Sequence, residues 1–163
     1  MTAPVEARFV EFRTDEAGIT GTLIRYGDVA RFGEWSEEFQ PGSLRFDDVI
    51  VNLQHDRGKP VARTGAGLTL TDTASELRAE IVLPDTRYAR EARELIGAGI
   101  IRGMSMEFRA KVDEWTERHR VVKEAILSGF ALVDRPAYPA SEIAARFDRE
   151  IRVPSKMPRR VFV

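Results

Sequence analysis

The sequence predicts a mainly β fold with a few helices (α+β), arranged as a closed or partly closed β-barrel of about seven strands. Apolar and polar residues alternate over most of the first eighty residues, which is the period of a half-buried strand. Glycine and proline interrupt this alternation at short intervals. Only one segment has a convincing helical period, and 163 residues with 43% hydrophobic side chains suit a single core.

The first expected elements are two strands. Residues 7–13 and 19–26 alternate, and the second is rich in β-branched and aromatic side chains, so we expect a hairpin around residues 14–18. Residues 27–48 contain several turn-forming glycines and a proline, yet they also carry large aromatic side chains. We therefore expect an ordered excursion that packs on the domain.

The middle of the chain predicts further strands. Residues 48–55 are apolar on one face and are followed by a polar turn at 56–60. Residues 67–71 and 76–83 alternate and are expected to pair with each other.

A helix is expected after Pro84, with Thr86 as its N-cap and Gly97 or Gly99 at its end. Its apolar stripe consists of Tyr88, Ala92, Leu95 and Ile96. These positions follow the i, i+4, i+7, i+8 spacing of one helix face, so we expect them to pack on the core. The exposed remainder of the helix could serve a homodimer.

The last third of the chain predicts strands at 104–110, 120–127 and 129–133, with a charged connection between the first two. We expect residues 1–147 to form one domain. Residues 148–163 contain two prolines and are expected to be an extended or mobile tail.

Composition excludes several classes of function. The chain has no cysteine, which excludes disulfides, thiol catalysis and cysteine-based zinc sites. Its 25 Lys and Arg residues nearly balance 26 Asp and Glu residues, which argues against nucleic acid as the main ligand. No cluster has the spacing of a metal site or of a phosphate-binding loop, so we expect no metal and no cofactor. No apolar run approaches the roughly 20 residues of a membrane helix, and no signal peptide is visible, so we expect a cytosolic protein without a membrane partner.

The two histidines have different contexts. His119 lies in the charged connection, where a surface position is the simplest interpretation. His55 continues the face of its strand that is otherwise formed by Val49, Val51 and Leu53. It is either a histidine at a barrel rim that bonds a backbone carbonyl, or a base that is packed on one side and open on the other.

Ser105 and Glu107 share one face of the strand at 104–110, while methionine and phenylalanine take the other face. Their β-carbons should be roughly 6–7 Å apart, a separation that one imidazole can bridge. The set Ser105, His55 and Glu107 could therefore act as nucleophile, base and orienting acid. Polar alternation also describes any strand face that meets solvent, so the pattern alone leaves both interpretations open.

Four segments in this order resemble the HK97-type phage prohead protease family. They are Glu37-Glu38-Phe39-Gln40-Pro41-Gly42-Ser43-Leu44, Leu53-Gln54-His55-Asp56, Gly99-Ile100-Ile101-Arg102-Gly103-Met104-Ser105-Met106-Glu107-Phe108, and Leu132-Val133-Asp134-Arg135-Pro136-Ala137-Tyr138-Pro139. The resemblance spans residues 18–147. It implies a serine endopeptidase with a herpesvirus-assemblin-like β-barrel, in which His55 is the general base and Ser105 the nucleophile. Such enzymes cleave the scaffold or N-terminal extension of the major capsid protein, and themselves, inside the immature capsid in the host cytoplasm.

The sequence departs from this family in the third catalytic residue. Many members carry a Glu-x-Ser pattern that falls at Gly129 and Ala131 here, and neither residue can orient a histidine. Glu107, Glu124 and Asp134 are the candidates. Glu107 is favoured because it stands where many members have glycine, so this chain would supply there the carboxylate that it lacks at Gly129.

The oxyanion hole has one candidate by analogy with the paired arginines of assemblins. Arg135, or the backbone amides near it, would donate to the developing charge. Alternatively, Arg135 pairs with Asp134 at the end of a strand.

Two other functions remain open. The missing acid at Gly129 is what a non-enzymatic capsid assembly or scaffold module with a decayed site would show. A small-molecule esterase would need an apolar acyl pocket.

Overall fold

The computed structural model describes residues 5–15 and 18–134, which form twelve strands and one helix. The strands are β1 (Val5–Glu11), β2 (Arg13–Asp15), β3 (Gly18–Arg25), β4 (Ala30–Phe32), β5 (Trp35–Phe39), β6 (Leu44–Arg45), β7 (Ile50–Leu53), β8 (Asp56–Thr64), β9 (Gly67–Asp72), β10 (Glu76–Ile81), β11 (Gly103–Thr116) and β12 (His119–Val133). The helix is α1 (Arg87–Gly97). The predicted mainly β class is confirmed. The predicted domain end at residue 147 and the tail at 148–163 lie outside the described residues.

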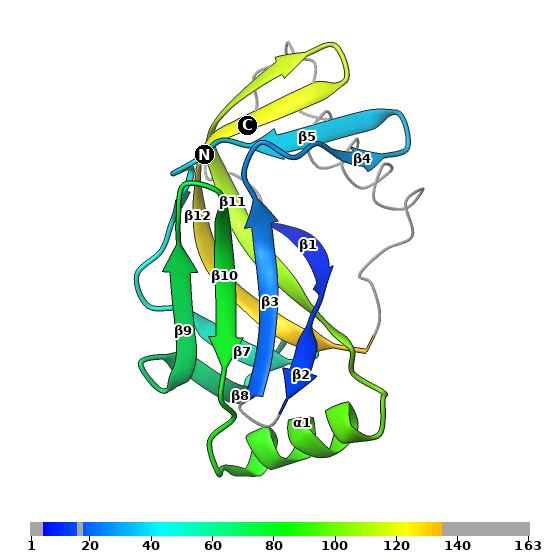
Figure 1. The fold of residues 1–163 in the computed structure, drawn as a ribbon, viewed down its shortest axis with the longest axis vertical. Coiled ribbons are helices and arrows are strands. Elements are labelled where there is room, and N and C mark those ends of the chain that lie inside the picture. Colours follow the sequence, from blue (N-terminus) through cyan, green and yellow to red (C-terminus); the bar gives the residue numbers. More distant parts are fainter. Residues whose placement is uncertain (1–4, 16–17, 135–163) are drawn as a thin grey trace.

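The sheet is an open, curled half-barrel (Figure 1). Of the predicted closed or partly closed barrel of about seven strands, the closed form and the strand number are wrong, because the sheet has twelve strands and stays open. Its main path runs β1-β11-β12-β7-β8-β9-β10-β3-β2, and β1 and β2 are the two ends of this path. These edge strands are separated in sequence only by Phe12, but they pair with different neighbours. The barrel therefore does not close by a ladder between them.

The predicted first hairpin is only partly present. The short strand β2 pairs with β3 as expected, whereas β1 crosses to the far end of the path and pairs antiparallel with β11. A buried charge cluster accompanies this crossing, because Glu6 on β1 binds the fully buried Arg120 on β12 through two hydrogen bonds of 2.7 and 2.8 Å. Local alternation carries no information on such a long-range contact.

The excursion at residues 27–48 packs on the domain, as predicted. It forms β4, β5 and β6, of which β5 and β6 pair in parallel with successive parts of β12. Trp35, Phe39 and Leu44 are buried. This pairing places the excursion along β12, at the end of the molecule remote from α1 (Figure 1).

The predicted polar turn at 56–60 is wrong. These residues belong to β8, which pairs with β7, and the turn consists of Gln54 and His55. The polar residues of β8 are tolerated because most of their side chains are exposed. The expected strands at 67–71 and 76–83 are confirmed as the antiparallel pair β9 and β10.

The predicted helix is confirmed, although Thr86 makes no hydrogen bond with its side chain at the N-terminus. Its contact with the core is made by the buried Ala89 and Ala92 together with the half-buried Tyr88, Leu95 and Ile96. The helix covers one end of the curled sheet (Figure 1). This helix, the one in the described part of the chain, is neither long nor apolar enough to cross a membrane.

β11 and β12 form a long antiparallel hairpin that organises the sheet. The predicted strands at 120–127 and 129–133 are both parts of β12, and the predicted charged connection is the tip of the hairpin. The inner face of β11 buries Met104, Met106 and Phe108 in the core. The opposite face carries Ser105 and Glu107, as the alternation predicted.

Candidate active site

His55 lies in a two-residue turn between β7 and β8, where Leu53 pairs with Asp56. Gln54 and His55 both have left-handed backbones, with φ of 55° and 60°. This conformation is typical of hairpin turns formed by Asn-Gly or Gly-Gly, and it costs free energy for a residue such as glutamine. The structure thus holds His55 at the tip of a strained turn.

Two hydrogen bonds tie the same turn to the end of β12. The backbone N–H of Gln54 donates to the carbonyl of Leu132 at 2.9 Å. The side-chain Oε1 of Gln54 accepts the backbone N–H of Asp134 at 3.0 Å. The turn is therefore attached to β12 through the residue that precedes His55.

Glu107 is the carboxylate that meets His55. Its Oε2 lies 3.4 Å from His55 Nδ1, and both side chains are about one-third exposed (32% for Glu107 and 38% for His55). The interaction with the His55 ring lowers the pKa of Glu107 below its ordinary value, with a smaller contribution from Arg57, while partial burial opposes the shift. The carboxylate is therefore ionised at neutral pH and can hold the imidazole by its Nδ1 side.

Gly129 is the neighbour of this carboxylate on β12. It is the register partner of Glu107 on β12, and a β-carbon added to it would lie 3.9 Å from Glu107 Oε1. The acid and the glycine are thus cross-strand neighbours.

Ser105 is on the same face of β11 as Glu107, opposite Ala131 of β12 and Phe9 of β1. Its side chain is completely buried, and its hydroxyl has no hydrogen-bond partner in the described part of the chain. The structure thus brings His55 and Glu107 together and places Ser105 two residues along the strand, without a hydrogen bond between Ser105 and His55.

A cavity of about 640 Å³ adjoins Glu107. Its walls come from β1, β7, β8, β11 and β12 and from the segment before α1, and they include Arg57, Arg109, Ser128 and Gly129 beside several aliphatic side chains. The lining is mixed, because the aliphatic side chains alternate with charged groups such as Arg57, Glu107 and Arg109.

The other predicted candidates are distributed differently. Glu124 pairs with Arg45 at 3.3 Å, on a part of β12 that faces β6. Asp134 meets the His55 turn through its backbone N–H. Arg135 lies outside the described residues. Among the described residues there is no group of three or more side chains that could hold a metal ion.

His119 has a more specific environment than the predicted surface position. Its Nδ1 lies 2.7 Å from Ser36 Oγ, and its Nε2 lies 2.9 Å from Glu38 Oε1. Ser36 and Glu38 lie two residues apart on one face of β5, just as Ser105 and Glu107 do on β11. The sequence contained this pattern, but nothing in it indicated that β5 runs beside β12 in parallel.

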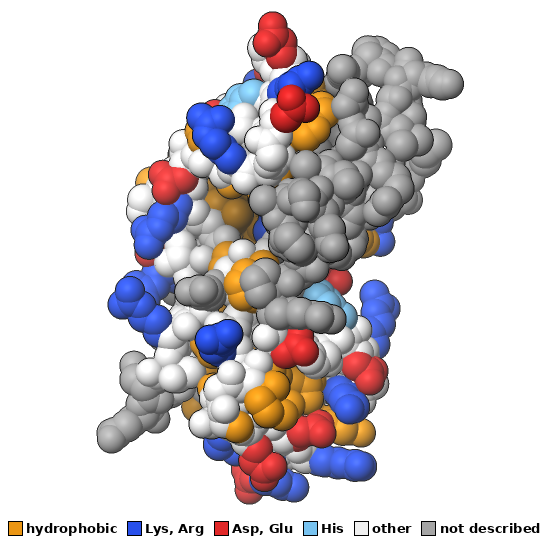
Figure 2. Space-filling view, turned by 90° about the vertical axis from the view of Figure 1, so that its right-hand side faces the viewer, with side chains coloured by type: hydrophobic (Ala, Val, Ile, Leu, Met, Phe, Trp, Pro, Cys, Tyr) orange, Lys and Arg blue, Asp and Glu red, His pale blue; other side chains and the backbone are white. Residues whose placement is uncertain are grey.

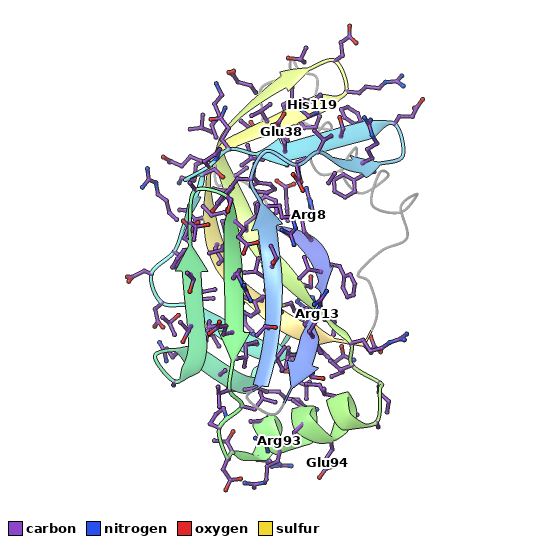
Figure 3. The ribbon with its side chains drawn as sticks, in the orientation of Figure 1. Arg8, Arg13, Glu38, Arg93, Glu94 and His119 are labelled. Atoms are coloured by element: carbon purple, nitrogen blue, oxygen red, sulfur yellow. The ribbon has the colours of Figure 1, made fainter. Side chains whose placement is uncertain are left out.

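The two histidines form two separate centres. Figure 3 shows His119 and Glu38 together at the end of the molecule remote from α1, and Figure 2 shows two separate histidine side chains on one face. The cavity adjoins Glu107 of the first centre, and none of its lining residues belongs to the second. The Ser36–His119–Glu38 contacts attach β5 to the tip of the β11–β12 hairpin.

Comparison with known proteins gives a family and a fold. The family model described as caudovirus prohead serine protease matches residues 4–153. No curated protein matches. Among solved structures, the capsid assembly protease gp21 of bacteriophage T4 is similar with a TM-score of 0.51 at 13% sequence identity, over 82% of this chain and 99% of that one. The identity is low, so this likeness supports the fold alone, whereas the family model covers most of the chain. The chain belongs to the caudovirus prohead serine protease family.

Proposed function

We propose that this protein is the serine endopeptidase of prohead maturation, with Ser105 as nucleophile, His55 as general base and Glu107 as the acid that orients the base. Its substrates are the scaffold segment or N-terminal extension of the major capsid protein and its own chain, inside the immature capsid in the host cytoplasm. The observation that carries this proposal is the contact of His55 with Glu107 beside the cavity, on the strand face that also bears Ser105.

The chemistry follows from the two ring nitrogens. Glu107 faces Nδ1 of the His55 ring and would hold the tautomer in which Nδ1 carries the proton. Nε2 is then free to accept the proton of the Ser105 hydroxyl. The Ser105 oxygen attacks the scissile carbonyl, and the imidazolium returns the proton to the leaving amine. A water molecule then loses its proton to Nε2, attacks the acyl-enzyme and releases the acid with regeneration of Ser105.

The buried Ser105 hydroxyl implies a conformational step. A completely buried oxygen cannot meet a peptide carbonyl, and its missing hydrogen bond costs free energy in this state. Catalytic hydrogen bonds are often loose without substrate and tighten in the complex. Binding of a peptide in the cavity would therefore expose Ser105 and bring it to His55.

The test uses the two serine–histidine centres as each other's control. Ser105→Ala and His55→Gln should abolish cleavage of the co-expressed capsid protein and self-cleavage, as measured by intact mass. Ser36→Ala and His119→Gln, which remove the corresponding groups at the hairpin tip, should leave the cleavage products unchanged. Cleavage by Ser105→Ala would refute the proposal, and selective loss in Ser36→Ala would move the site to the other centre.

One specific observation favours an assembly module with a decayed site. Ser105 is buried without a hydrogen bond to His55, as expected for a nucleophile that no longer functions. A fluorophosphonate probe separates the two functions, because the probe reacts with Ser105 only if the centre is active. An active protein is labelled as the wild type and is not labelled as His55→Gln. An unlabelled wild type that fails to cleave capsid protein would favour the assembly module.

A further inference from the structure

We infer that Gln54 is a positioning residue that fixes His55 against Glu107 by clamping the turn to β12, an assignment that rests on the proposed function. The hydrogen bonds of Gln54 in the described part of the chain go to Leu132 and Asp134 and not to Glu107, so we expect its effect to pass through the backbone of the turn.

The turn residue is an unusual choice. Two-residue hairpin turns with left-handed backbones favour asparagine and glycine because these residues adopt positive φ at low cost. Histidine tolerates this region better than most residues, but glutamine has no such preference. The φ of 55° at Gln54 is therefore strain that turn propensity does not explain.

The side chain of Gln54 accounts for its presence. Its Oε1 accepts the backbone N–H of Asp134, and the backbone N–H of Gln54 donates to the carbonyl of Leu132, so one residue bonds the end of β12 at two points. β7 already pairs in parallel with β12 up to Leu53, opposite Leu132. The two bonds extend this attachment by one residue, to the position adjacent to His55.

β12 also positions Glu107, through the β11–β12 ladder. The acid lies opposite Gly129 on this strand, and a β-carbon added to Gly129 would lie 3.9 Å from Glu107 Oε1, in ordinary van der Waals contact. The base and its acid are thus both located relative to β12, one through Gln54 and the other through the β11 ladder. A change in the clamp shifts His55 while Glu107 stays in place.

The test compares the rate of fluorophosphonate labelling of Ser105 among three Gln54 variants of the full chain. Gln54→Met keeps the length of the side chain but removes the acceptor, and Gln54→Glu keeps an acceptor. We expect the maximal labelling rate of Gln54→Met to fall about tenfold, with the half-saturating probe concentration unchanged, because small misplacements of a catalytic group carry penalties of this size or larger. Gln54→Glu should recover most of the rate.

Gln54→Gly separates positioning from stability. Glycine relieves the backbone strain, so the thermal unfolding midpoint should stay the same or rise, while the labelling rate falls as in Gln54→Met. Glu117→Gly is the matched control, because Glu117 also has a left-handed backbone (φ 52°) in the turn between β11 and β12. This variant should gain stability without any change in labelling.

A readout that does not depend on activity completes the test. The chain has two histidines, so ¹⁵N-histidine labelling gives two sets of ring signals, which His119→Gln assigns. Gln54→Met should move the His55 ring signals toward those of Glu107→Gln and leave the His119 signals in place. Unchanged His55 signals, or full labelling by Gln54→Met with an active wild type, would overturn the inference while the proposed function stands. An inactive wild type in which Ser105 is never labelled would remove both.

Discussion

Glu107 determines the electrostatics of the candidate site at the scale of single residues. It is half-buried, it faces the His55 ring, and this interaction holds its pKa below the ordinary value against the opposing effect of burial. A carboxylate in this state stays charged well into the acidic range. Removal of its charge alone should therefore affect both the stability and the chemistry of the site.

The stability of the protein should depend on Glu107 in a pH-dependent way. The pKa of Glu107 is lowered in the folded state relative to 4.5, so its stabilising effect is complete above pH 4.5. As the pH falls further, the unfolded chain takes up the proton first and the effect is lost. Thermal unfolding of wild type and Glu107→Gln should show a difference at pH 6 that shrinks toward pH 3.

A control at an exposed carboxylate tests this assignment. Glu124→Gln alters a surface ion pair with Arg45 and should give a much smaller difference over the same pH range. A difference between wild type and Glu107→Gln that grows toward low pH would contradict the direction of the Glu107 shift.

The β11–β12 hairpin is the element that assembles the site. It places Ser105 and Glu107 on one face, sets Glu107 opposite Gly129, and holds the end of β12 against the His55 turn. An acid at the position of Gly129 would start directly opposite Glu107. The resemblance to prohead proteases, in which many members have the acid at the position of Gly129, agrees with this geometry.

Relocation of the acid tests the hairpin. Glu107→Gly should slow fluorophosphonate labelling of Ser105 by at least about a hundredfold, because the imidazole loses its orienting partner. Addition of Gly129→Glu to this variant should recover about tenfold, since the new side chain starts beside the vacated space. The recovery is expected to be partial because the new β-carbon would lie 3.1 Å from the carbonyl of Ile50.

The single variant Gly129→Glu is the control for relocation. It adds a second carboxylate near the first and should not increase labelling above the wild type. If the double variant labels no faster than Glu107→Gly, His55 does not accept an acid from β12.

At the scale of the whole molecule, a buried charge cluster joins four strands. Arg120 donates to Glu6 at 2.7 and 2.8 Å, to Asp113 at 2.7 Å and to Glu37 at 3.1 Å. Arg8 adds bonds to Glu37 and Glu6. Burial alone would raise the pKa of Glu6, but Arg120 and Arg8 hold it below its ordinary value. The cluster thus ties the edge strand β1 to β5, β11 and β12.

Loss of Arg120 should therefore destabilise the whole fold. Arg120→Met removes the cation that the buried carboxylates of Glu6, Glu37 and Asp113 share, and we expect a loss of about 3–5 kcal/mol in the free energy of unfolding. The thermal midpoint should fall by roughly 10 °C for a chain of this size. Arg45→Met, which removes only an exposed pair, is the control and should change stability by less than about 1 kcal/mol. Equal effects of the two variants would show that the cluster does not hold β1 in place.

Several parts of this molecule follow from local sequence pattern. The helix, the β9–β10 pair and the two faces of β11 were predictable because each depends on a period of 3.6 or 2 within one segment. A contact of His55 with Glu107 was a possibility that followed from the shared face of Ser105 and Glu107. The prediction that His55 continues the face of a strand is wrong, because His55 lies in the turn between β7 and β8. The Ser36–His119–Glu38 contacts were not predicted, because they depend on the parallel pairing of β5 with β12.

The sequence by itself determined the mainly β class, the exclusion of thiol chemistry, and the faces on which Ser105 and Glu107 lie. Tertiary structure alone decided the open sheet, the course of β1, and the strained turn that carries His55. The physical reason is range. Side-chain period is a property of consecutive residues, whereas strand order, the buried Arg120 cluster and the Gln54 clamp arise from hydrogen bonds between residues far apart in the chain.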